Sequence, residues 1–113
     1  MPAIEKDRYF TILMDFEVEP DQQQALIDGI AEQVELYFRH DPAFVSISFH
    51  ASEDGLRVVN YAQWRSRQAW AWAPTGPDAP ASAAIRAVLD RCGGRRVGLD
   101  FFSVAGVVEA AAA

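Results

Sequence analysis

A side-chain amide in the middle of an otherwise apolar strand face is the polar group best placed for chemistry in this sequence. Along residues 56–64, the alternate positions Leu56, Val58, Asn60, Ala62 and Trp64 share one face. A buried amide that lacks a hydrogen-bond partner costs roughly 1–3 kcal/mol. Asn60 therefore either bonds to local backbone or points into a cavity and meets a ligand, and the sequence leaves both readings open.

Tryptophans gather just after this amide. Trp64 adds an indole N–H donor and a broad apolar wall near Asn60, and such a pair suits a flat, oxygenated aromatic ligand. Trp70 and Trp72 are two residues apart on an expected short helix, so they point to roughly opposite sides. One can pack on the sheet, and the other is either a pocket wall or an interface residue. Because packing is the commoner role of such residues, their spacing alone does not assign them to a site.

Other kinds of active site find little support. The sequence has no phosphate-binding glycine loop, dinucleotide fingerprint or nucleophile elbow. His40 and His50 do not have metal-ligand spacing with each other or with Cys92, so no metal site is expected. Period-two alternation places His50 on the sheet face opposite Asn60, where an interface histidine is expected. Cys92 is expected at a helix C-terminus as a small hydrophobic residue, because the helix dipole disfavours a thiolate there.

Length and charge bound the remaining possibilities. The 113 residues predict one domain over 1–113, with an ordered core at about 8–108 and a loose C-terminal alanine tail. A net charge of −6 argues against nucleic acid or an anionic membrane as a partner. With a single cysteine, no apolar run of membrane-spanning length and no signal-peptide core, the chain is expected to be cytoplasmic.

Hydropathy periods predict an α+β domain around the amide. Strands are expected at 8–18, 44–52, 56–64 and 97–108. Helices are expected at 19–41, 66–73 and 82–91, with a loop rich in proline and glycine at 74–80. The order β-α-β-β-α-β, with the second helical region divided, is that of a ferredoxin-like sandwich whose helices cover one sheet face.

The other sheet face is expected to be unusually apolar, because six large residues fall on it: Tyr9, Leu13, Phe44, Val59, Tyr61 and Phe102. An exposed patch of this kind commonly marks an interface. Homodimerisation through the sheet face is the simplest way to cover it. The alternative is an ordinary mixed surface with scattered aromatic residues.

Several short runs resemble a known family. Phe44-Val45-Ser46, Phe49-His50-Ala51-Ser52, Asp54-Gly55 and Val58-Val59-Asn60-Tyr61-Ala62-Gln63-Trp64 are similar to segments of the antibiotic biosynthesis monooxygenase family. The similarity is strongest to the small anthrone monooxygenases of aromatic polyketide pathways, and it extends more loosely over most of the chain. It implies a dimeric ferredoxin-like α+β barrel that oxidises phenolic polyketides to quinones with O2 and without flavin, haem or metal.

The resemblance also implies roles for particular residues. Asn60 and Trp64 match the family's paired polar pocket residues, and Arg86, in the run Ile85-Arg86-Ala87, matches a pocket arginine. Phe49 is expected to line the pocket, and Trp70 and Trp72 to contact substrate. Trp70 stands where similar enzymes have a tyrosine, which puts a phenol-based proton relay in doubt. From its position alone, Arg86 could equally be a solvated helix residue.

The expected function is therefore cofactor-independent oxygenation of an anthrone- or naphthol-like aromatic polyketide, with O2 as co-substrate. The expected partners are a small aromatic substrate and a second copy of the chain. Two other functions suit a polar pair in an apolar pocket equally well: a polyketide cyclase, and a small-ligand-binding module without turnover. Neither would consume O2.

Overall fold

The computed structural model describes residues 8–71 and 80–111. Its strands are β1 (Phe10–Glu17), β2 (Phe44–Ala51), β3 (Arg57–Trp64) and β4 (Arg95–Ser103). Its helices are α1 (Gln23–Tyr37), α2 (Arg67–Ala71) and α3 (Pro80–Cys92), and a 3-10 turn at Pro20–Gln22 leads into α1. This order confirms the predicted ferredoxin-like β-α-β-β-α-β layout, with the second helical region divided into α2 and α3.

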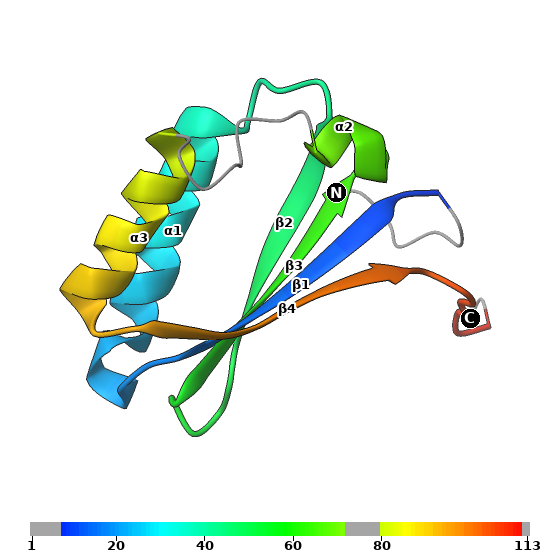
Figure 1. The fold of residues 1–113 in the computed structure, drawn as a ribbon. Coiled ribbons are helices and arrows are strands. Elements are labelled where there is room, and N and C mark those ends of the chain that lie inside the picture. The colour runs from blue at the N-terminus through cyan, green and yellow to red at the C-terminus, as the bar shows by residue number, and fades with distance from the viewer. Residues whose placement is uncertain (1–7, 72–79, 112–113) are drawn as a thin grey trace.

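The strands form an antiparallel sheet in the order β2-β3-β1-β4. Figure 1 shows α1 and α3 side by side on one side of this sheet, with α2 at the end where β3 finishes. The two central strands, β3 and β1, therefore turn every second side chain toward the helices. No helix in the described part of the chain is long and apolar enough to cross a membrane.

The core lies between the central strands and the two long helices. It contains Ile12 and Phe16 of β1, Val58 of β3, Leu26 and Ile30 of α1, and Val88 of α3, all of them at most 1% exposed. The helices approach closely at Gly29, where an added Cβ would lie 2.6 Å from Val88 Cγ1. A side chain at this position would have to displace a buried valine, so the α1–α3 contact requires glycine.

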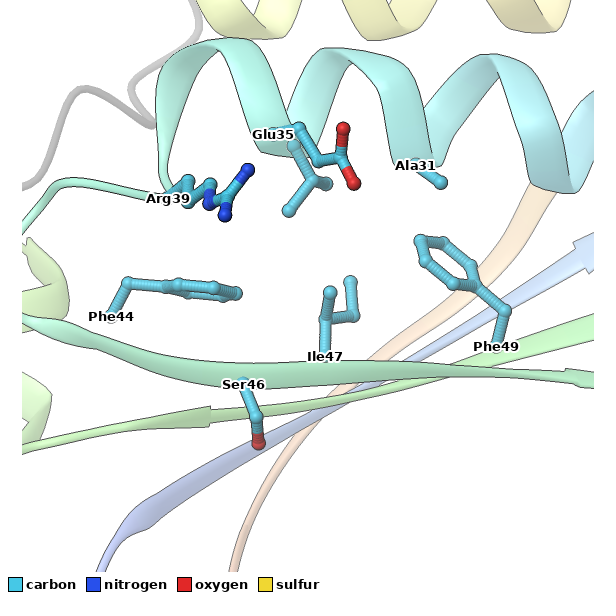
Figure 2. A pocket seen from close by; sticks show the side chains of 8 residues that line it. Ala31, Glu35, Arg39, Phe44, Ser46, Ile47 and Phe49 are labelled. Carbon is cyan, nitrogen blue, oxygen red and sulfur yellow. The ribbon is translucent and has the colours of Figure 1, made fainter. Parts of the chain in front are cut away.

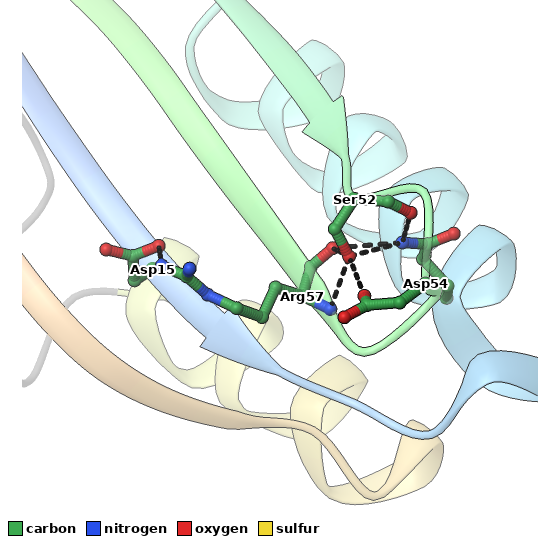
Figure 3. A network of polar contacts seen from close by, with 5 residues as sticks. Asp15, Ser52, Asp54 and Arg57 are labelled. Atoms are coloured by element: carbon green, nitrogen blue, oxygen red, sulfur yellow. Dashed lines mark hydrogen bonds and ion pairs between the residues drawn. The ribbon is translucent and has the colours of Figure 1, made fainter.

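A polar network holds the hairpin between β2 and β3 (Figure 3). Asp54 accepts hydrogen bonds from the Leu56 backbone N–H at 3.0 Å and from Ser52 Oγ at 2.8 Å. These bonds lower the pKa of the Asp54 carboxyl below its ordinary value, the Leu56 bond most strongly. Gly55 supplies the positive φ of 79° that the turn needs. The hairpin thus fixes the β2–β3 register, which places Phe49 opposite Asn60.

The structure corrects one face assignment. Phe44 was expected on the open sheet face, but the β2–β3 register shifts between Phe44 and Ser46. This irregularity turns Phe44 toward the helices, where its ring contacts Phe38 and Trp64. The expectation was wrong because strict alternation does not allow for an extra residue in one strand.

Two further details differ from the sequence reading. Leu56 was expected on the buried face, but it precedes β3 and is 46% exposed. The last strand was expected to run to residue 108, but β4 ends at Ser103. Both differences lie at strand ends, where hydrophobic composition extends past the last paired residue.

Candidate functional site

Cross-strand register places Asn60 in a row of otherwise apolar side chains on the helix-facing side of the sheet. Phe49 of β2 and Met14 of β1 are its neighbours on either side, and Leu99 of β4 lies beyond Met14. Two residues further along β3, a second row runs through Ala62. Another two residues along β3, Trp64 is paired with Phe44 of β2 on one side and with Phe10 of β1 on the other.

Asn60 is 3% exposed, and its Oδ1 atom is buried without a hydrogen-bond partner among the described residues. The side chain therefore does not bond to the local backbone, which was one of the two readings open from the sequence. An unpaired amide in an apolar row carries a desolvation cost of roughly 1–3 kcal/mol. Such a group is expected to be paired when a ligand with complementary polar atoms is present.

Trp64 is 4% exposed and is held between aromatic rings. Its ring makes edge-to-face contacts with Phe38, at 5.6 Å between centroids, and with Phe44, at 5.3 Å. These contacts explain its burial and fix its orientation. Four residues of strand separate Trp64 from Asn60, roughly 13 Å between Cα atoms. That both side chains contact one ligand stays a prediction, and their separation means that they would meet different parts of it.

A second aromatic group lies on the same face, and we call Phe10, Trp70 and Phe101 the aromatic patch. Their ring centroids are 5.2–5.7 Å apart, and Phe10 is the register partner of Trp64. Phe101 is 40% exposed, whereas Phe10 and Trp70 are half-buried. The patch is thus an apolar surface that the described part of the chain covers only in part.

Met14 and Leu99 extend this partly covered surface to Asn60. Both pack against the core, yet neither is fully buried, unlike Phe16 and Val58 in the next row of the sheet. On β4 this partly covered surface runs from Leu99, in the Asn60 row, to Phe101 of the aromatic patch, whereas on β1 the residue between Met14 and Phe10, Ile12, is 1% exposed.

Phe49 lines a pocket on the other side of Asn60. Figure 2 shows Phe49, Ile47 and Phe44 pointing from β2 toward α1, whereas Ser46 points away. The pocket has a volume of about 320 Å³ and is lined by Ala31, Val34, Glu35, Arg39, Phe44, Ser46, Ile47 and Phe49. Asn60 and Trp64 are not among its lining residues. That Phe49 contacts substrate stays a prediction.

The remaining predicted site residues are less closely tied to Asn60. Arg86 is exposed on α3, next to the half-buried Ile85, so its role in a pocket stays a prediction. Trp72 lies outside the described residues. His50 is exposed and lies opposite Val59, which confirms its place on the other sheet face. Its Nε2 is 3.0 Å from Ser48 Oγ.

The sequence reading missed Arg67. Its guanidinium lies over the rings of Phe10, at 5.8 Å, and Phe101, at 5.1 Å. Arg67 and Trp70 are three residues apart on α2, so they share one side of that helix. This spacing was the available signal, but it could not show which strands the helix would face. In the described residues, no group of three or more histidine, cysteine or acidic side chains could hold a metal ion.

Two proteins of known structure resemble this chain over most of its length. A monooxygenase of Streptomyces coelicolor (ActVA-Orf6), solved in complex with nanaomycin D, is 32% identical. That match covers 93% of this chain and 95% of that one, with a TM-score of 0.75. SnoaB, a cofactor-independent oxygenase of Streptomyces nogalater, shares the fold at 19% identity and a TM-score of 0.61, over 89% of this chain and 97% of its own.

A curated relative and a family model complete the comparison. Tetracenomycin-F1 monooxygenase of Streptomyces glaucescens is 51% identical over 57 residues, 50% of this chain. The matched region spans 51% of that relative, about half its length. The model for antibiotic biosynthesis monooxygenase matches residues 9–81, which include β1, α1, the β2–β3 hairpin and α2. The match covers more than half of the chain and confirms the resemblance found in its residues: this chain belongs to the antibiotic biosynthesis monooxygenase family.

Proposed function

We propose that the chain is a cofactor-independent oxygenase that oxidises a phenolic aromatic polyketide, anthrone- or naphthol-like, to a quinone with O2. The observation that carries this proposal is the buried side-chain amide of Asn60, whose Oδ1 has no hydrogen-bond partner among the described residues, beside the partly covered surface of Leu99 and the aromatic patch. The names of the similar proteins support it, since one is a tetracenomycin-F1 monooxygenase and another was solved with nanaomycin D.

In this reaction the substrate supplies the electrons. An anthrone loses a proton to give an electron-rich anion, which passes one electron to O2. The two radicals recombine to form a hydroperoxide. Loss of water then leaves a carbonyl where the CH2 group was, so one oxygen atom enters the quinone and the other leaves as water. The protein has to favour the anion, exclude bulk water and stabilise the oxygen-bearing intermediates.

The candidate residues can divide these tasks. The amide N–H groups of Asn60 and the indole N–H of Trp64 donate to substrate oxygens, and each such donor contributes about 2–4 kcal/mol in a dry site. Because these residues are separated along β3, they serve oxygens at different places on the ring system. Arg86 favours ionisation of the phenol by its charge. Phe49, Trp70 and Trp72 contact the flat rings.

We also propose that the chain forms a homodimer through the open sheet face, giving a dimeric α+β barrel. Leu13, Val59 and Tyr61 lie there half-buried, and Phe102 is 47% exposed. A second sheet would cover these side chains and remove them from water.

The function is tested by oxygen uptake with metal-stripped protein and a hydroxylated anthrone. The expected result is consumption of one O2 per anthrone, with the quinone as product identified by mass. An absolute requirement for added flavin or iron would contradict cofactor independence. A product with a new ring and an unchanged oxidation state would identify a cyclase, and binding without conversion would identify a ligand-binding module.

A further inference from the structure

We propose that Arg67 is a specificity-determining cation, which holds the ionised phenolic oxygen of an aromatic ligand at the edge of the aromatic patch. The inference rests on the proposed function for its ligand class, an ionised hydroxy-aromatic molecule. It assigns to Arg67 a role that the sequence did not suggest.

The first support is position. The Arg67 guanidinium lies over two rings of the aromatic patch, Phe10 and Phe101, at 5.8 and 5.1 Å from their centroids. Phe10 is the register partner of Trp64. A flat ligand that extends along β4 from Leu99, in the Asn60 row, to Phe101 would therefore bring one edge to this guanidinium.

The second support is that no described residue accepts a hydrogen bond from Arg67. Within the described residues its guanidinium contacts aromatic rings but makes no hydrogen bond or ion pair. Three other arginines do use their guanidinium donors. Arg57 pairs with Asp15 at 2.6 Å, Arg95 pairs with Glu17, and Arg65 Nε donates to the Pro42 carbonyl at 2.6 Å.

The third support is charge. Guanidinium N–H groups lie in the plane of the group, so contact with rings leaves donors available to an oxyanion. Asn60 and Trp64 are neutral, and the chain carries a net charge of −6, which repels anions at long range. A local cation on the apolar surface offsets this repulsion where the ligand lies, and it selects the ionised form over the neutral phenol.

The test is a spectroscopic titration of bound alizarin, a hydroxyanthraquinone whose colour changes when its phenol ionises. In wild-type protein the pKa of the bound phenol is expected to fall below that of the free dye by about one unit, a tenfold preference for the phenolate. Arg67→Gln should reduce this shift, whatever part of it Arg86 supplies. Arg67→Lys keeps the charge but loses the planar fork, so an intermediate shift is expected.

Arg96→Gln is the matched control, because it removes the same charge from an exposed residue near the other end of β4 from Phe101. It should leave the bound pKa at the wild-type value. The proposal is overturned if the pKa of the bound dye is the same in Arg67→Gln as in Arg96→Gln or in wild-type protein. It is also overturned if wild-type protein does not bind the dye. If Arg67→Gln no longer binds dye, an unshifted pKa in Arg67→Lys overturns it and a lowered one supports it.

The titration needs no turnover, so its result is independent of oxygen uptake. An Arg67-dependent shift in a protein that consumes no O2 would refute the oxygenase function and support the anion site. Oxygen uptake by a protein in which the pKa of the bound dye does not depend on Arg67 would support the oxygenase function and refute the anion site.

Discussion

Asn60, Thr11 and Gln63 each bury an unpaired side-chain atom in the described part of the chain, and of the three only Asn60 lies on the helix-facing side of the sheet. A leucine or valine at this point of β3 would complete the apolar row between Phe49 and Met14 without an unpaired polar atom. Proteins tolerate such a group where it has another use, and accepting a hydrogen bond from a substrate hydroxyl is one that accords with the surrounding apolar surface.

Asn60→Ala is expected to lower kcat by about 10²–10³-fold, the loss typical of one donor to a developing oxyanion. Because Oδ1 makes no hydrogen bond within the described residues, the fold should persist, as judged by circular dichroism and thermal unfolding. Turnover at the wild-type rate would remove Asn60 from the mechanism.

For single residues, the sequence predicted which side of the sheet a side chain lies on better than it predicted which side chains it contacts. Alternation along 56–64 correctly placed Asn60 and Trp64 on the helix-facing side, because the side-chain period of a strand is fixed. It misplaced Phe44, because an irregularity in β2 interrupts that period. The ring contacts of Arg67 were beyond prediction, since the direction of a five-residue helix depends on tertiary packing.

Among the elements, the β2–β3 hairpin has the most direct effect on the site. Its hydrogen bonds fix which residue of β2 stands opposite Asn60, and Gln23 of α1 adds donors to the carbonyls of Ser52, at 3.1 Å, and Arg57, at 2.9 Å. A shift of one residue in this pairing would turn Phe49 away from the helices.

The lowered pKa of Asp54 makes part of the hairpin's stability depend on pH. The folded state binds the proton less tightly than the unfolded chain, so the stabilisation is complete above the ordinary aspartate pKa of 3.8 and is lost as pH falls through the lowered folded value. Asp54→Asn should therefore lower the melting temperature at neutral pH and differ less from wild type in acid. A difference that does not change with pH would contradict this reading.

The contact between α1 and α3 gives a second prediction for the elements. Gly29→Val should lower the free energy of unfolding by about 2 kcal/mol, because the added atoms meet Val88 in a filled core. Gly106→Val is the control, since nothing lies within 4 Å of a Cβ built there. Equal effects of the two substitutions in denaturant unfolding would show that the close approach of the helices is unimportant.

For the whole molecule, the open sheet face predicts self-association. Phe102→Glu places a charge on this face and should shift the protein from dimer to monomer in sedimentation equilibrium. Leu36→Glu, at a residue that is 70% exposed on α1, should leave the dimer intact. A wild-type monomer, or loss of the dimer in both variants, would contradict association through the sheet.

The arrangement of the whole chain was also largely predictable. Period two, period 3.6 and the turn residues gave the order of elements, and that order restricts the topology to few choices. The extent of cover over β1 and β4 was not predictable. It depends on how α2 and α3 pack, and that packing leaves Met14, Leu99 and the aromatic patch partly open.

The central claim is that O2 reacts with substrate at this apolar surface without a cofactor. Its most direct test is the rate of ¹⁸O incorporation from ¹⁸O2 into the quinone by metal-stripped protein, measured beside a protein-free reaction and the Asn60→Ala variant. The account predicts one labelled oxygen per quinone, formed far faster by wild-type protein than in either comparison. Unlabelled product, or equal rates in all three reactions, would contradict it.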